Sequence, residues 1–294
     1  MNGDSAVNVL ELKDHESLPM FAVSPELAER IRKYNLEQNI EDMQTLGFTV
    51  VKDVAQDEFI AGLRSAIVRC CQEDKGQYFG ITKKGISSDL LLARDPLIAE
   101  ATLNPKILTM IEFMCGRGAQ ISQVSGSVRF AGANAMPLHC DQSWLPAPFP
   151  EHNALMTACW YCDDTTDEAS GATKVVPGSH RERRHPNPEE VKAEAGARPL
   201  VAPRGSVGMW DGRLWHANYP RAREGERVLL HATYCRLAYR PLEDYGPVSE
   251  ELIAKHGPVM ADMLGRNHWW GNRNWNNGAV DMSKYMNTER DSRR

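Results

Sequence analysis

The sequence predicts an α+β fold whose β-rich part is a two-sheet β-barrel or jelly roll with helices packed on it. Two observations support this prediction. Helical periodicity dominates the first third of the 294-residue chain, and short strand-like runs separated by Gly, Pro and Asp turns begin at about residue 119. Helices followed by a series of short strands are typical of folds in which the helices cover one face of an antiparallel sheet.

Three helical stretches and one strand are expected before the barrel. Residues 25–46 begin with Ser-Pro-Glu, which favours a capped helix start, and residues 56–74 carry apolar side chains at helical spacing. Between them, residues 47–54 (GFTVVKDV) are expected to form a short strand. Residues 96–116 are again periodic, but Asn104-Pro105 predicts a break, because proline lacks the N–H that a helix interior needs.

Six strand-like runs are expected to build the barrel. Each is rich in apolar or β-branched residues and ends near a turn residue. The run ALMTACWYC is apolar almost throughout, which indicates a buried strand, with Trp160 more consistent with the core than with a cofactor wall. The six runs are 119–130, 136–144, 154–162, 173–178, 205–210 and 227–239.

Composition indicates an ordinary globular protein. Apolar residues make up 42% and charged residues 25%, and we place one domain at 25–245, between an N-terminal extension (1–24) and a C-terminal extension (246–294). The formal net charge of -5 gives no general attraction to nucleic acid or to an anionic membrane. Residues 1–20 carry acids and no long apolar stretch, so we expect neither a signal peptide nor a membrane anchor and predict a cytoplasmic protein.

The seven cysteines indicate buried, reduced thiols. Their number is odd and they are scattered among apolar neighbours, as in proteins of a reducing compartment. Cys159 and Cys162 match a CxxC spacing, yet residues three apart on a strand face opposite ways and no second pair of zinc-finger spacing accompanies them. We therefore expect a buried strand at this position and neither a structural zinc nor a redox pair.

The triplet His139-Cys140-Asp141 and the distant His216 carry the main functional prediction. On an extended strand, residues i and i+2 point to the same face, so His139 and Asp141 would project together. A second imidazole would complete a 2-His-1-carboxylate iron(II) site, which leaves positions open for a co-substrate and dioxygen. A solvated polar pair is the common alternative for H-x-D alone. The other candidates for the third ligand are His152, His180, His185, His231, His256 and His268.

Arg227 follows His216 by eleven residues and begins a strand-like run. Its planar fork could hold the far carboxylate of a keto-diacid through two charge-assisted hydrogen bonds. Under strand alternation, Arg227 shares a face with Leu229, His231 and Thr233, which suggests the barrel interior. A surface arginine at the start of a strand is the alternative.

A series of motifs in a fixed order carries a family resemblance. They are His139-x-Asp141-Gln142, Trp160-Tyr-Cys-Asp163-Asp164, Gly171-Ala-Thr173-Lys-Val-Val-Pro177-Gly-Ser-His180, Gly205-Ser206, His216 and Arg227. From about Gly47 to Pro241, the chain resembles the phytanoyl-CoA dioxygenase family of iron(II)/2-oxoglutarate oxygenases. The resemblance implies a double-stranded β-helix (a jelly-roll, cupin-like barrel), iron held by His139, Asp141 and His216, and 2-oxoglutarate anchored by Arg227. It also implies oxidation of an unactivated C–H bond, such as hydroxylation, coupled to decarboxylation of 2-oxoglutarate to succinate and CO2.

Three further residues are candidates for the co-substrate pocket. Thr173 could donate its hydroxyl to 2-oxoglutarate, or could simply be a β-branched residue that suits a strand. Gln142 follows the iron carboxylate and could orient co-substrate or substrate, although strict alternation would turn it away from the metal. Many relatives keep a glycine-rich stretch after the second histidine, where this chain has Ala217-Asn218-Tyr219-Pro220. Asn218 could reach the 2-oxoglutarate carboxylate there.

The substrate is expected to be a small, hydrophobic organic molecule that is lipid-like or natural-product-like. Residues 268–275 (HWWGNRNW) hold three of the seven tryptophans and are predicted to cover the barrel mouth of this or a neighbouring subunit of a homodimer, or else to pack on the outer helices. The basic cluster 181–185 could meet a phosphate, as in a coenzyme A thioester, although a solvated loop is the simpler interpretation. A non-catalytic or differently metallated cupin-like ligand-binding protein is the alternative function. We set aside a serine hydrolase, because G-x-S-x-G is absent.

Overall fold

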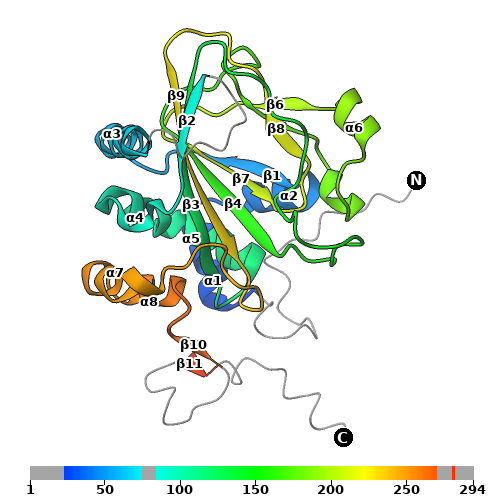
Figure 1. Cartoon of the computed structure of the whole chain (residues 1–294). Coiled ribbons are helices and arrows are strands. Elements are labelled where there is room, and N and C mark those ends of the chain that lie inside the picture. The colour runs from blue at the N-terminus through cyan, green and yellow to red at the C-terminus, as the bar shows by residue number, and fades with distance from the viewer. Residues whose placement is uncertain (1–22, 75–83, 270–279, 282–294) are drawn as a thin grey trace, which may run out of the picture.

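Two antiparallel sheets form a jelly roll that is covered on one side by helices (Figure 1). The computed structural model describes residues 23–74, 84–269 and 280–281. The larger sheet has the strand order β1-β7-β4-β9-β3-β2, and the smaller has the order β6-β5-β8. The strands of these two sheets are β1 (Phe48–Val51), β2 (Gly85–Ser88), β3 (Gln120–Phe130), β4 (Leu155–Tyr161), β5 (Thr173–Val175), β6 (Arg198–Leu200), β7 (Val207–Asp211), β8 (His216–Asn218) and β9 (Glu226–Cys235).

The helices of the first third lie close to where the sequence places them. The predicted helix over 25–46 is divided in two, because Asn35 adopts a left-handed conformation with φ 52°. Ser24 caps the first of the two by accepting a hydrogen bond from the Leu27 N–H at 3.1 Å. Asn104 caps the helix that starts at Pro105, so the predicted break is confirmed. The helices are α1 (Pro25–Lys33), α2 (Glu37–Thr45), α3 (Asp57–Glu73), α4 (Pro96–Thr102), α5 (Pro105–Cys115), α6 (Pro188–Ala193), α7 (Ser249–His256) and α8 (Pro258–Met263).

Five of the six predicted barrel strands are confirmed, as β3, β4, β5, β7 and β9. The prediction of a strand over 136–144 is wrong, since only His139 pairs there, in an isolated bridge with His216. Pro137 has no N–H to contribute to a ladder, and the backbone bends at Asp141. Strands β2, β6 and β8 were not predicted, because strands of three or four residues are too short to show periodicity.

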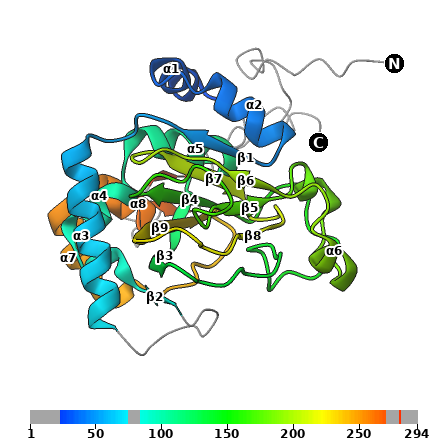
Figure 2. The same ribbon diagram turned by 90° about the horizontal axis from the view of Figure 1, so that it is seen from above.

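One face of the larger sheet packs on helices α3 and α5 (Figure 2). Alternate residues of its strands, such as Val124 of β3 and Leu230 of β9, point into this core. Trp160 of β4 lies in the same core, with its ring centre 5.9 Å from that of Phe59. The interpretation of Trp160 as a core residue is therefore confirmed.

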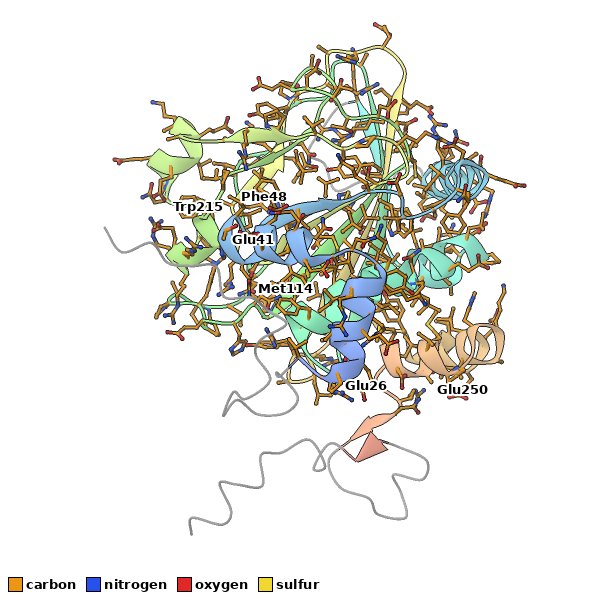
Figure 3. All side chains as sticks on the ribbon, turned by 180° about the vertical axis from the view of Figure 1, so that it is seen from behind. Glu26, Glu41, Phe48, Met114, Trp215 and Glu250 are labelled. Atoms are coloured by element: carbon orange, nitrogen blue, oxygen red, sulfur yellow. The ribbon has the colours of Figure 1, made fainter. Side chains whose placement is uncertain are left out.

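The opposite face of the larger sheet is turned toward the smaller sheet. Tyr161 and Leu229 pack against Val175 there, and this second cluster also contains Phe48. Figure 3 shows Phe48 on the side of the smaller sheet and Glu250 of α7 on the helical side. Further polar side chains of this face line a cavity. The larger sheet thus separates a helix-covered core from the interior of the barrel.

The two cysteines of the CxxC spacing lie in different clusters. Cys159 packs between the two sheets, whereas Cys162 belongs to the helix-covered core. All seven cysteines are buried and none forms a disulfide. Burial raises the pKa of Cys159 to about 12, which keeps its thiol protonated and unreactive. The prediction of a buried strand with these two cysteines on opposite faces is confirmed.

Part of the predicted C-terminal extension packs on the domain. Helices α7 and α8 place Leu252 and Met260 in the helix-covered core. The predicted lid, residues 268–275, lies outside the described residues, apart from the backbone of β10 (His268–Trp269), which pairs with β11 (Val280–Asp281). None of the helices in the described ranges has the length and apolarity that a membrane span requires. The homodimer stays a prediction.

We expect Trp160→Ala to lower the free energy of unfolding by about 3–5 kcal/mol, because it removes a fully buried aromatic ring. Urea unfolding followed by circular dichroism would measure this loss. Val201→Ala is a matched control at a side chain that is 52% exposed, and it should stay within about 0.5 kcal/mol of the parent protein. A loss below about 1 kcal/mol for Trp160→Ala would contradict its place in the core.

Candidate active site

His139 and His216 face each other across a backbone bridge. The N–H of His139 donates to the carbonyl of His216 at 3.0 Å, and the N–H of His216 donates to the carbonyl of His139 at 2.8 Å. The two ring centres lie 4.4 Å apart. His139 lies in the loop after β3, and His216 is the first residue of β8. The bridge between them therefore brings together two residues that are far apart in the sequence.

The orientation of both rings leaves Nε2 available. Nδ1 of His139 contacts the Pro137 carbonyl and Nδ1 of His216 contacts the Leu214 carbonyl, each at 3.0 Å. A carbonyl only accepts, so each Nδ1 carries a proton that it donates. The Nε2 atoms of His216 and His139 lie 3.3 and 4.0 Å from Oδ1 of Asp141. Backbone carbonyls orient the imidazole ligands of metal sites in the same way.

Asp141 presents one carboxylate oxygen to the histidines and the other to the larger sheet. Oδ2 accepts hydrogen bonds from the Thr157 hydroxyl and from Nε1–H of Trp210, both at 2.9 Å. Burial alone would raise the pKa of the Asp141 carboxyl, but His216, His139 and Trp210 outweigh it and hold the pKa below its ordinary range. Asp141 is therefore an anion at neutral pH, with Oδ1 directed at the two imidazoles.

These three side chains fit a divalent metal such as iron(II). Their ligand atoms all lie within 4.8 Å of one another, and no other such group was found among the described residues. Burial lowers the pKa of His139, which favours the neutral imidazole that binds a metal. Although burial opposes it, Asp141 raises the pKa of His216, because an anion beside an imidazole favours its protonated form.

Arg227 is a buried cation in the same region. Its guanidinium donates to the Gly171 carbonyl and, at 3.1 Å, to Oδ1 of Asn218, while its Nε has no hydrogen-bond partner. Arg227 is only 1% exposed, and burial lowers its pKa. No Asp or Glu in the described part of the chain forms an ion pair with it, and a buried charge without a counter-ion is unfavourable. The site therefore suits an anion such as the far carboxylate of 2-oxoglutarate.

Thr173 and Asn218 are register partners between β5 and β8, and both line the cavity together with Arg227. The Thr173 hydroxyl lies 2.9 Å from the hydroxyl of Tyr161. The amide nitrogen of Asn218 lies 3.1 Å from the sulfur of Met136. The structure thus brings together three of the four residues that the sequence analysis proposed for the co-substrate.

Gln142 is the fourth residue, and the structure corrects its assignment. It is fully buried and does not line the cavity. Its Oε1 accepts from the Ala154 N–H at 2.7 Å, and its backbone N–H donates to the Gly212 carbonyl at 3.1 Å. These contacts fix the backbone that follows Asp141. Gln142 is therefore a positioning residue for the Asp141 backbone and does not face the co-substrate.

A buried ion pair supports the same part of the barrel. Arg213 donates to both carboxylate oxygens of Asp211, at 2.9 and 2.7 Å, and to the Pro150 carbonyl at 3.3 Å. Asp211 ends β7, and Pro150 belongs to the loop before β4. The pair therefore ties this loop to the strand that carries Trp210.

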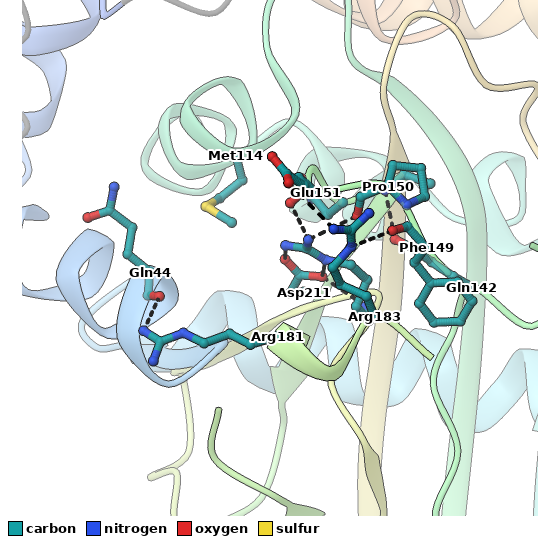
Figure 4. Close-up of polar contacts among 12 residues, drawn as sticks. Gln44, Met114, Gln142, Phe149, Pro150, Glu151, Arg181, Arg183 and Asp211 are labelled. Carbon is teal, nitrogen blue, oxygen red and sulfur yellow. Dashed lines mark hydrogen bonds and ion pairs between the residues drawn. The ribbon is translucent and has the colours of Figure 1, made fainter. Parts of the chain in front are cut away.

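The basic cluster 181–185 is engaged with the protein itself. Arg181 donates to the Gln44 carbonyl at 3.2 Å and Arg183 to the Phe149 carbonyl at 2.6 Å (Figure 4). Arg184 donates to Glu190, with distances of 2.7 and 2.8 Å. These contacts favour a loop-anchoring role for the cluster over a phosphate site.

One cavity of about 590 Å³ is lined by His139, Asp141, His216 and Arg227, together with other residues. Trp210, Thr157 and Arg129 also line it, although no motif in the sequence indicated them. Arg129 is the register partner of Arg227 between β3 and β9. Strand alternation indicates that such residues share a face, but only the pairing of the strands shows which of them meet.

The family model of Phytanoyl-CoA dioxygenase (PhyH) matches residues 43–227, which is more than half of the chain. The chain belongs to the phytanoyl-CoA dioxygenase family. The matched range contains all three residues of the His-Asp-His group and ends at Arg227. The resemblance given by the motifs is therefore confirmed, and so are the predicted oxygenase class, the iron(II) cofactor and the 2-oxoglutarate co-substrate of the family.

A curated relative supports this membership over part of its length. Dioxygenase af480 of Aspergillus fumigatus is 32% identical to the chain over 171 residues, which are 56% of this chain and 54% of that protein. The match thus spans about half the length of this relative.

Two solved structures share the fold. HygX from Streptomyces hygroscopicus, crystallised with nickel, 2-oxoglutarate and hygromycin B, has a TM-score of 0.60, with 69% of this chain and 88% of HygX covered. SnoK, a non-heme alpha ketoglutarate dependent carbocyclase from nogalamycin biosynthesis, has a TM-score of 0.61, with 73% and 90% covered. Each is 17% identical to this chain. The likeness confirms the predicted jelly-roll fold.

We expect Asp141→Ala and His216→Ala each to weaken binding of manganese(II), a stand-in for iron(II), by about 100-fold or more. Each removes a ligand, whereas loss of an outer partner of a ligand alone costs about 10–100-fold. Isothermal titration calorimetry of the metal-free protein would measure the affinities, with His256→Ala on α7 as the control. Parent-like affinity in both variants would place the metal elsewhere.

We expect Arg227→Lys to raise the dissociation constant for 2-oxoglutarate about tenfold or more, which is about 1.4 kcal/mol. A lysine supplies a point charge and cannot reproduce a two-pronged contact. Anaerobic titration of the iron(II)-loaded protein would measure the constant, with the exposed Arg32→Lys as the control. An unchanged constant would move the anchor to another arginine, and Arg129 would be the first to examine.

Proposed function

We propose that the protein is an iron(II)- and 2-oxoglutarate-dependent dioxygenase that oxidises an unactivated C–H bond of a small organic substrate. The reaction is hydroxylation or a related oxidation, and 2-oxoglutarate is decarboxylated to succinate and CO2. One observation carries the proposal, which is that a His-Asp-His group lines the same cavity as a buried arginine that pairs with no carboxylate of the described residues. A cation site and an anion site in one cavity suit a metal ion and a dicarboxylate.

The residues of the site have separate tasks. Nε2 of His139, Nε2 of His216 and Oδ1 of Asp141 would hold the iron, which supplies the activation of dioxygen when bound. Thr157 and Trp210 keep the Asp141 carboxylate from rotating, because both donate to its other oxygen.

The co-substrate would be anchored at the other end of the cavity. Arg227 would bind the far carboxylate of 2-oxoglutarate, and Asn218 fixes the plane of its guanidinium. Thr173, beside Asn218 in register, would offer its hydroxyl to the same carboxylate. The cavity walls would exclude bulk water from this ion pair, which strengthens it.

The cavity suits a natural-product-like substrate with an apolar part. Its volume of about 590 Å³ is within the range of small-molecule sites. Trp144 and Leu242 line it and are 48% and 45% exposed, so they offer apolar contacts near its opening. The hygromycin B bound to HygX and the role of SnoK in nogalamycin biosynthesis support a substrate of this kind.

Anaerobic addition of iron(II) and 2-oxoglutarate to the protein tests the proposed function. We expect a weak visible charge-transfer band, followed by succinate release when oxygen and a suitable substrate are added. The band should be absent from Asp141→Ala and unchanged in His256→Ala. A protein that binds both components and never forms succinate would instead be the non-catalytic ligand-binding alternative.

A further inference from the structure

The cavity face of β3 carries a column of polar side chains. Gln123, Ser125 and Ser127 alternate along this strand, and all three line the cavity. No residue in the described ranges makes a hydrogen bond with any of these three side chains. Polar groups in a partly buried lining need partners, so they must be met by water or by a polar ligand.

His231 of β9 extends this column toward the metal site. It is the register partner of Ser125 and also lines the cavity. It is not a member of the His-Asp-His group, and no described residue hydrogen-bonds to its ring. Its ring centre lies 6.2 Å from that of Trp210, which itself contacts Asp141. Burial lowers the pKa of His231 to about 4, so the neutral ring offers one donor and one acceptor.

Other polar residues on the same sheet face are paired within the protein. The hydroxyls of Thr157 and Thr233 lie 3.1 Å apart, and Tyr161 is paired with Thr173. Gln123, Ser125, Ser127 and His231, which have no side-chain hydrogen bond to any described residue, are neighbours on β3 and β9, while Trp144 and Leu242 offer apolar contacts to the same cavity. The lining thus has a polar part next to the metal site and an apolar part near the opening.

We propose that Gln123, Ser125, Ser127 and His231 form a polar wall that binds hydroxyl groups of the primary substrate. The inference rests on the proposed function and narrows its substrate class to amphiphilic, hydroxylated molecules, within the hydrophobic, lipid-like or natural-product-like class expected from the sequence. The polar wall would hold the hydroxylated edge of the substrate, and Trp144 and Leu242 would contact its apolar part. His231 would then position the C–H bond that faces the metal site.

Matched compounds test the substrate class in the enzyme loaded with iron(II) and 2-oxoglutarate. The panel contains alkyl glycosides and hydroxylated terpenoids, each paired with a deoxy counterpart, and the readout is succinate released above the substrate-free background. We expect the best hydroxylated compound to exceed its deoxy counterpart by about tenfold or more, because a site built for a hydroxyl discriminates strongly against its absence. Equal release from both members of each pair, or no release with any hydroxylated compound, would overturn the inference.

Paired variants distinguish a loss of substrate binding at the polar wall from a loss of folding and from a loss of co-substrate binding. His231→Gln keeps a donor and an acceptor, whereas His231→Leu removes both, so the KM for the best hydroxylated compound should rise about tenfold or more only in His231→Leu. Ser125→Ala should raise the same KM, and Ser65→Ala on the exposed face of α3 is the control. Equal effects of the two His231 variants, or a KM for 2-oxoglutarate that rises as much as that for the substrate, would overturn the inference.

The proposed function has its own readout in this experiment. Absence of the visible band and of background succinate in the parent protein would contradict the proposed function. A normal band with no discrimination between hydroxylated and deoxy compounds would contradict only the polar wall.

Discussion

The pair of hydrogen bonds to Oδ2 of Asp141 is the interaction on which the site depends. The donors, Thr157 of β4 and Trp210 of β7, are direct register partners in the larger sheet. Because strand side chains alternate, a slip of one residue in this register would turn a donor toward the helix-covered core. The register of two strands therefore sets the direction of Oδ1 toward His139 and His216.

The same sheet places an anion and a cation in the lining of one cavity. The anionic Asp141 faces the two imidazoles, and the cationic Arg227 lies on β9 without a carboxylate partner in the described part of the chain. A buried guanidinium without a counter-ion is unfavourable in a barrel interior until an anion binds to it. Ligands that bind only the folded state stabilise it, so metal and dicarboxylate binding would add to the stability of the barrel as well as to its chemistry.

The sequence predicted best what strand alternation and local spacing determine. The helix caps at Ser24 and Asn104 follow from a few adjacent residues. The buried position of Arg227 follows from the pattern of β9. The strand expected around His139 was wrong, yet His139 and Asp141 still converge, because the bridge to His216 replaces the ladder.

Residues defined by pairing between distant strands could not be predicted. Thr157, Trp210 and Arg129 become neighbours of the site only through the register of the larger sheet. Gln142 was predicted to contact the co-substrate from its position next to Asp141, but its side chain accepts a hydrogen bond from the backbone N–H of Ala154. A crystal structure from crystals grown anaerobically with iron(II) and 2-oxoglutarate would test the assigned metal and co-substrate ligands most directly. We predict metal on the Nε2 atoms of His139 and His216 and on Oδ1 of Asp141, with the far carboxylate of 2-oxoglutarate on Arg227. Metal at another group of residues, or a dicarboxylate that does not contact Arg227, would contradict the assignment.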